Sequence, residues 1–173
     1  MEWQLVNVVM KTRLLTEKPI DLSVLVRDLT NVVYNPGRFS GMVWKHKVIG
    51  GCCLLFANGK MIVNGFRSVS KCRQGARRYA RLLQNKLRGG YLHRVKIVTM
   101  TLLTNIKQRL CLEKMAVELN GQYESELFNA LTLRKGKIHF AVFRSGKIVV
   151  TGLKNLHDID RVVQPALLEI MLV

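Results

Sequence analysis

Acidic residues are scarce in this sequence. Its 173 residues include 28 Lys and Arg but only 11 Asp and Glu, which gives a formal net charge of +17. Divided at Gly90, the first part has 16 basic and 4 acidic residues (+12) and the second has 12 and 7 (+5). Such a charge is typical of small domains that bind a polyanion, most often nucleic acid. An acidic protein partner, or a basic surface that only maintains solubility, is the alternative.

Long hydrophobic runs are missing too. No segment approaches the ~20 consecutive apolar residues of a membrane span. Glu2 and Gln4 interrupt the apolar start that a signal peptide needs. We therefore expect no membrane association. The apolar fraction of 49% is that of a globular protein with one substantial core or two small fused cores.

Patterns for metal binding and catalysis are also absent. The cysteines form no CxxC pair and no metal-ligand spacing, so we expect buried thiols in a reducing compartment: Cys52, Cys53, Cys72 and Cys111. The four histidines are scattered, and no Ser/His/Asp or paired-carboxylate motif occurs. The sequence therefore predicts no cofactor, no metal, no small-molecule substrate and no enzymatic activity.

The strongest positive signal is an internal repeat. Residues 54–65, LLFANGKMIVNG, return at 141–152 as AVFRSGKIVVTG, with Phe, Gly, Lys and the last Gly in identical places. Upstream, Tyr34 and Phe39 return at the same spacing as Tyr123 and Phe128. Landmarks that recur in the same order indicate a duplicated unit. We predict two repeats, residues 1–90 and 91–173.

Hydrophobic periodicity predicts a similar element order in both repeats. In the first, we expect a strand at 3–10, a polar loop at 11–19, a short helix that Asp21 caps, and several antiparallel strands. A helix at 68–87 follows, with Ser68 or Ser70 as its N-cap and Gly89 as its C-terminal cap. In the second, we expect a strand at 94–103, a short helix at 112–119, strands at 131–133, 138–143 and 147–151, and a helix at 156–171 that Pro165 interrupts.

The predicted strands are apolar on both faces. Leu55 and Val63 belong to the face that the helices would cover, yet Leu54 and Ile62 on the opposite face are also apolar. Two helices per repeat are too few to cover both faces. We therefore predict a sheet with one exposed apolar face, which is typical of a binding surface.

These segments resemble the conserved core of the TATA-box-binding protein family, and the resemblance covers residues 3–172. It rests on Asn7-Val8-Val9, Asp21-Leu22, YNPGRF at 34–39, FANGK at 56–60, ARRYAR at 76–81, YESELF at 123–128, and FRSGK at 143–147 with Thr151-Gly152. The resemblance implies an α+β fold: a pseudo-two-fold saddle of two repeated halves, with a curved antiparallel sheet and helices on its convex face.

The resemblance also implies the functional residues. In the family the concave sheet binds the DNA minor groove, and two pairs of Phe wedge between base steps and kink the duplex. The matching wedges here are Phe39 with Phe56 and Phe128 with Phe143; ordinary core positions are the alternative. The positions that match the groove floor are Asn7, Val9, Leu54, Ile62, Asn64, Thr99, Thr101, Val149 and Thr151.

Further contacts are expected around the sheet. Arg38, Lys45 and Arg134 are the predicted phosphate contacts. The family's partner surfaces correspond to the basic helix with Arg77, Arg78 and Arg81, which meets transcription factor IIA, and to the loop with Glu124, Glu126 and Leu127, which meets transcription factor IIB.

Two functions remain open at this point. One is a nuclear transcription initiation factor that binds double-stranded DNA, bends the minor groove and recruits partners of the preinitiation complex. The other is an interaction scaffold of the same fold with weak or lost TATA binding, acting as an adaptor in a specialised transcription or chromatin complex. The four Phe and the charge favour the first function, whereas Thr99, Thr101 and Asn64 favour the second.

Overall fold

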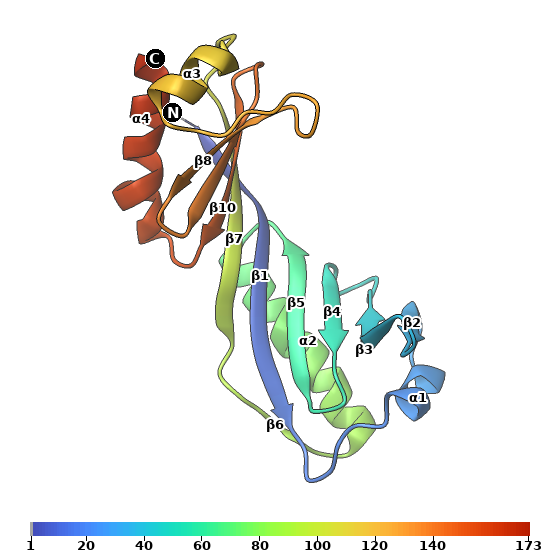
Figure 1. The fold of residues 1–173 in the computed structure, drawn as a ribbon. Helices are drawn as coiled ribbons and strands as arrows, with labels where there is room; N and C mark the ends of the chain where they lie inside the picture. Colours follow the sequence, from blue (N-terminus) through green and yellow to red (C-terminus); the bar gives the residue numbers. More distant parts are fainter. Residues whose placement is uncertain (1) are drawn as a thin grey trace. The chain divides into compact units, whose positions relative to one another are not determined.

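A computed structural model describes residues 2–173 of the chain (Figure 1). Its contacts divide into two compact units. The N-terminal unit consists of Asn7–Val98, and the C-terminal unit consists of Thr99–Val173 together with the first residues of the chain up to Val6. The boundaries of the two predicted repeats lie elsewhere, at residue 90, and remain a prediction.

Five neighbouring antiparallel strands form the sheet of the N-terminal unit, in the order β2-β3-β4-β5-β1. Helix α2 lies against one face of it (Figure 1). The elements are β1 (Trp3–Leu15), α1 (Leu22–Leu25), a 3-10 turn η1 (Val26–Asp28), β2 (Val32–Asn35), β3 (Phe39–Trp44), β4 (Cys52–Leu55), β5 (Lys60–Phe66), α2 (Val69–Leu87) and β6 (Tyr91–Leu92), which pairs with β1.

Strand β1 is longer than the sequence analysis predicted. Residues 11–15, expected in a polar loop, continue the strand, with Lys11 opposite Ile62 and Arg13 opposite Lys60. The physical reason is alternation: Thr12 and Leu14 are buried while their neighbours are exposed. The hydroxyl of Thr12 donates to the carbonyl of His93, 2.6 Å away, so this polar side chain is satisfied inside the unit.

The helix caps of the N-terminal unit are largely as predicted. Asp21 Oδ1 accepts from the backbone N–H groups of Ser23 and Val24, and Ser68 caps α2. The C-terminal cap differs from the prediction, because Arg88 and not Gly89 takes the left-handed conformation that closes α2 (φ 53°). The N–H of Gly89 then bonds the carbonyl of Gln84.

The C-terminal unit repeats this plan with the strand order β7-β10-β9-β8. Its elements are β7 (Lys96–Asn105), α3 (Leu112–Glu118), β8 (Leu131–Lys135), β9 (Ile138–Val142), β10 (Lys147–Leu153), a π-helical turn η2 (Ile159–Val163) and α4 (Gln164–Leu172). The helix expected at 156–171 does not break at Pro165 but changes type just before it, from the π-helical turn η2 to α4, which begins at Gln164. Pro165 lies in the first turn of α4, where a missing N–H costs least.

Both units bury one face of their strands. In the N-terminal unit the covered face holds Met42, Trp44, Cys53, Leu55, Met61 and Val63. In the C-terminal unit it holds Leu131, Leu133, Phe140, Val142, Ile148 and Val150. The alternate side chains are half-exposed or exposed, as expected for a sheet with one open face. Across residues 2–173, no helix is both long and apolar enough to cross a membrane.

Candidate nucleic-acid interface

Phe39 and Phe56 lie edge to face at one end of the open face of the N-terminal unit. Their ring centroids are 5.6 Å apart with an interplanar angle of 72°. Phe39 begins β3 and remains 41% exposed, while Phe56 follows β4 and is half-buried. Gly41 makes room for the pair, since a Cβ there would stand 2.7 Å from the Phe39 ring and 3.0 Å from the Phe56 ring. The two rings therefore form one semi-exposed aromatic cluster.

Phe128 and Phe143 form the matching pair in the C-terminal unit. Their centroids are 6.2 Å apart and their planes again meet at 72°. Phe128 is 50% exposed and Phe143 is half-buried. The backbone turns that precede β5 and β10 are the same, because the N–H of Phe56 bonds the carbonyl of Lys60, and that of Phe143 bonds Lys147. The repeat in the sequence thus produces the same aromatic geometry twice.

The predicted floor residues of the N-terminal unit share its open face. Leu54 lies opposite Ile62 across β4 and β5, and Asn7 and Val9 alternate with buried residues of β1. Asn7 Oδ1 accepts from the backbone N–H of Gly65, 2.9 Å away, at a bulge where Gly65 has φ 84°. Because the amide oxygen is used in this way, the side-chain NH₂ of Asn7 remains to donate. Donors are what the acceptor-only minor-groove edge of an A·T pair requires.

The C-terminal unit places its predicted floor residues equivalently but with different chemistry. Val149 lies opposite both Leu103 and Ala141, and Thr151 lies opposite His139. The bulge recurs at Gly152, where φ is 92°. Thr99 and Thr101 are half-exposed on β7. In the region that the structure describes, neither threonine makes the hydrogen bond that Asn7 makes to the bulge glycine.

The residues predicted to contact phosphates and protein partners are all exposed. Arg38 lies in the turn before Phe39, Lys45 directly follows β3, and Arg134 is on β8, where its Nε donates to the carbonyl of Gly136. Arg77, Arg78 and Arg81 are exposed on α2, whose other side buries Ala76, Tyr79 and Leu83. Glu124, Glu126 and Leu127 belong to the loop before Phe128, and Leu127 is 81% exposed.

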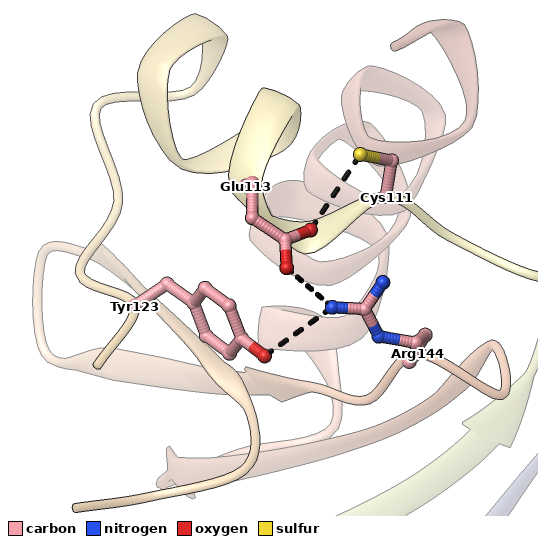
Figure 2. Close-up of polar contacts among 4 residues, drawn as sticks. All are labelled: Cys111, Glu113, Tyr123 and Arg144. Carbon is pink, nitrogen blue, oxygen red and sulfur yellow. Dashed lines mark hydrogen bonds and ion pairs between the residues drawn. The ribbon is translucent and has the colours of Figure 1, made fainter. Parts of the chain in front are cut away.

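A polar cluster that the sequence analysis did not identify lies next to Phe143 of the Phe128–Phe143 pair. Arg144 directly follows Phe143, and its Nη2 donates to Glu113 of α3 and to the hydroxyl of Tyr123 (Figure 2). The pKa of Glu113 is held below its usual value. The larger cause is a hydrogen bond from the backbone N–H of Glu113 to its own carboxylate, and the second is the hydrogen bond from Arg144. Tyr123 first, and Glu113 second, raise the pKa of Arg144. The cluster therefore ties three segments of the C-terminal unit together through charged hydrogen bonds.

The cysteines follow the prediction only in part. Cys53 and Cys72 are buried, and burial raises the pKa of Cys72 to about 11. Cys111 contradicts the prediction because it is exposed and lies against Glu113, with Sγ 3.6 Å from Oε2 (Figure 2). It occupies the place before α3 that Asp21 occupies before α1, but it makes no cap there. In residues 2–173, no group of three or more metal-ligating side chains occurs.

The fold is that of a known class. A solved structure of TATA-binding protein from Methanococcus jannaschii superposes with a TM-score of 0.85 and 27% sequence identity, and the match covers 100% of both chains. This match confirms the predicted α+β fold of the TATA-box-binding protein class.

The family model "Transcription factor TFIID (or TATA-binding protein, TBP)" matches residues 2–86 and 94–171. The chain therefore belongs to the TATA-binding protein family. TATA-box-binding protein of Candida albicans is 34% identical over 144 residues, which are 81% of this chain and 60% of the relative. TATA box-binding protein-like 2 of Mus musculus is 31% identical over 161 residues, 90% of this chain and 45% of the relative. The chain thus spans about half of the length of these relatives.

Proposed function

We propose that this protein is a transcription initiation factor that binds double-stranded DNA through the open face of its sheet and bends the minor groove. Its work is binding and deformation rather than chemical catalysis, and its place is the nucleus. The observation that carries the proposal is the pair of half-exposed Phe clusters, Phe39 with Phe56 and Phe128 with Phe143. An exposed Phe pair beside an apolar floor is suited to replace the stacking of a base step.

The floor supports the same function. Leu54 and Ile62 in one unit, and Val149 in the other, offer half-exposed apolar surface, while Asn7, Asn64, Thr99, Thr101 and Thr151 offer polar groups beside it. A·T pairs show only acceptors in the minor groove, so an apolar surface with hydrogen-bond donors beside it suits them. Arg38, Lys45 and Arg134 are the proposed phosphate contacts, and their role predicts affinity that falls steeply as salt concentration rises.

Partner recruitment is part of the proposal. The guanidinium groups of Arg77, Arg78 and Arg81 are exposed on α2, away from the buried side of that helix. They suit an acidic surface of a transcription factor IIA-like protein. Leu127 offers an exposed apolar side chain to a transcription factor IIB-like protein, and the carboxylates of Glu124 and Glu126 lie next to it in the same loop.

The deciding experiment removes one aromatic pair. Phe39→Ala combined with Phe56→Ala is expected to abolish bending, measured as energy transfer between dyes at the ends of a TATA duplex. Truncating a buried Phe lowers the free energy of unfolding by about 3–5 kcal/mol. Because both rings are partly exposed, the double variant should lose far less. Tyr91→Ala, which removes an exposed aromatic outside the two clusters, is the control and should leave bending intact. Unfolding of the double variant would show that the pair is core.

An interaction scaffold is the second candidate function. Thr99 and Thr101 favour it, because a hydroxyl reaches less far into a groove than the amide of Asn7. If the scaffold is correct, the wild-type protein will fold and bind a protein partner, yet it will neither bind nor bend TATA or non-TATA duplexes at moderate salt.

A further inference from the structure

The open face of the N-terminal unit carries two cations that the resemblance does not assign. Lys11 and Arg13 are exposed and alternate along β1 with the buried Thr12 and Leu14. They therefore point to the same side of the sheet as Asn7 and Val9. Lys11 lies opposite Ile62, next to the apolar floor, and Arg13 lies opposite Lys60.

The equivalent places in the C-terminal unit are uncharged. Strand pairing identifies them, since Val149 lies opposite Leu103 and Lys147 lies opposite Asn105. Lys11 thus corresponds to Leu103, and Arg13 corresponds to Asn105. Two extra positive charges distinguish the open face of one unit from that of the other.

Nothing within the N-terminal unit neutralises these cations. Arg13 and Lys60 form a directly opposed like-charge pair, which destabilises a sheet in the absence of a counter-charge. No strand of the described chain contains an Asp or a Glu. The ion pairs found in residues 2–173 are Lys114–Glu118, Lys135–Glu169 and Arg144–Glu113, and all belong to the C-terminal unit. A bound polyanion would remove the repulsion between Arg13 and Lys60.

We propose that Lys11 is a specificity-determining residue for DNA, and that Arg13 with Lys60 anchors the phosphates next to the Phe39–Phe56 pair. This inference rests on the proposed function. The ammonium of Lys11 has three donors and no acceptor, so it matches the acceptor-only edge of an A·T pair. A G·C pair places a donor NH₂ in the minor groove, which Lys11 cannot satisfy. The Lys60 ammonium lies 5.5 Å from the centroid of Phe56, which puts a positive charge beside the aromatic pair.

The N-terminal unit therefore discriminates more strictly at one base pair than the C-terminal unit does at the equivalent base pair. Leu103 supplies only apolar contact at the equivalent place, and contact of that kind distinguishes A·T from G·C less sharply than a donor does. The difference gives the two similar units unequal base preference, with the stricter A·T requirement under the N-terminal unit.

The test converts each cation into the residue of its counterpart. Lys11→Leu, Arg13→Asn and the control Lys71→Leu are compared on duplexes in which one G·C pair is moved stepwise through an A·T run, with fluorescence anisotropy at several salt concentrations. Lys71 is exposed on α2, the helix that packs on the covered face. Circular dichroism establishes that every variant is folded.

Lys11→Leu should reduce the A·T preference at one base pair by about tenfold, the scale of a single mismatch. Arg13→Asn should weaken all duplexes about equally and reduce the slope of log affinity against log salt by about one. Lys71→Leu should change neither quantity. As a check that needs no variant, acetylation of Lys11 in the wild type should slow when the duplex is added, while acetylation of Lys71 does not.

Two results would overturn the inference. If the wild type binds DNA but Lys11→Leu keeps the full base preference, then Lys11 does not determine specificity, whether or not its acetylation is slowed. If the wild type binds no duplex at low salt, the proposed function fails and this inference fails with it. The first result leaves the proposed function standing.

Discussion

The two units share a backbone plan but treat charge in opposite ways. The N-terminal unit, Asn7–Val98, has 18 basic and 3 acidic residues (+15), which leaves 10 basic and 8 acidic residues (+2) for the rest of the chain. The ion pairs of the described residues all lie in the more balanced unit. The N-terminal unit therefore keeps its cations available to an external anion, whereas the C-terminal unit uses several of its cations in ion pairs with its own carboxylates.

The cores of the two units also differ, by an exchange of large and small residues. Trp44 lies opposite Cys53 across β3 and β4, whereas Leu133 lies opposite Phe140 across β8 and β9. All four are buried on the covered face. The aromatic ring is therefore on one strand of the pair in the N-terminal unit and on the other strand in the C-terminal unit. Similar volume is filled in two ways, as close packing allows.

The largest expected effect comes from reversing this exchange. Trp44→Leu should destabilise the protein by about 3 kcal/mol, because a large buried ring is lost. That ring also packs against Tyr79, with 5.0 Å between the two ring centroids. Cys53→Phe alone should cost about 1–3 kcal/mol through overpacking. The double variant, which copies the Leu133–Phe140 arrangement, should be more stable than the sum of the two costs predicts. Urea unfolding of all four proteins measures the coupling.

Val43→Leu, on the open face beside Trp44, is the control and should couple to Cys53→Phe much less. Strict additivity of Trp44→Leu and Cys53→Phe would show that the two side chains do not share one volume. The buried Trp44 Nε1 has no hydrogen-bond partner among the residues that the structure describes. Its removal therefore offsets part of the cost of Trp44→Leu.

Much of the fold could be predicted from the sequence because the repeat and the turn residues are local signals. Asp21 and Ser68 were identifiable as caps by residue type, and the Phe pairs by their recurrence. Residues 11–15 were missed because Lys11 and Arg13 made the segment look like a polar loop. The signal was present: Thr12 and Leu14 continue the alternation of β1, and that period decides the face on which each cation lies.

The Arg144 cluster could not be predicted for a different reason. Its members come from three segments that are far apart in the sequence: Glu113 from α3, Tyr123 from a loop, and Arg144 from the turn before β10. The repeat gave no guidance either, because Arg144 corresponds to Ala57 in the other unit. Long-range polar contacts depend on tertiary placement, which neither periodicity nor turn chemistry specifies.

A smaller effect is expected from making the N-terminal floor resemble the C-terminal floor. Asn7→Thr removes the acceptor of the Gly65 N–H, so it should lower the free energy of unfolding by about 1 kcal/mol. It should also weaken binding to TATA duplexes, because the NH₂ donors of Asn7 are lost. Chemical denaturation and anisotropy measure the two effects. The reverse change, Thr99→Asn, is the matched control. If it stabilises the protein and strengthens binding, the floor difference between the units is causal. If neither change has an effect, Asn7 is not part of the binding site.

The smallest expected effect concerns the brace that only the C-terminal unit has. Glu113→Gln removes the charge that faces Arg144 but keeps the shape of the side chain (Figure 2). Because both side chains are solvent-exposed, the melting temperature near neutral pH should fall only slightly. The Phe128–Phe143 end should also become less rigid, which hydrogen exchange of the backbone around Tyr123 would reveal.

The pH dependence identifies the cause of this effect. The folded-state pKa of Glu113 is lowered, so the stability that its charge contributes is present above the ordinary Glu pKa and is lost as the pH falls through the folded-state value. The difference in melting temperature between wild type and Glu113→Gln should therefore be present at pH 7 and shrink toward zero as the solution is acidified below about pH 4.5, the ordinary value. Glu126→Gln, in the exposed loop of the same unit, should produce no difference at either pH. A difference for Glu113→Gln that persists unchanged in acid would mean that shape rather than charge holds the brace, and the contrast between the charge-braced unit and the open cationic unit would then lose its main support.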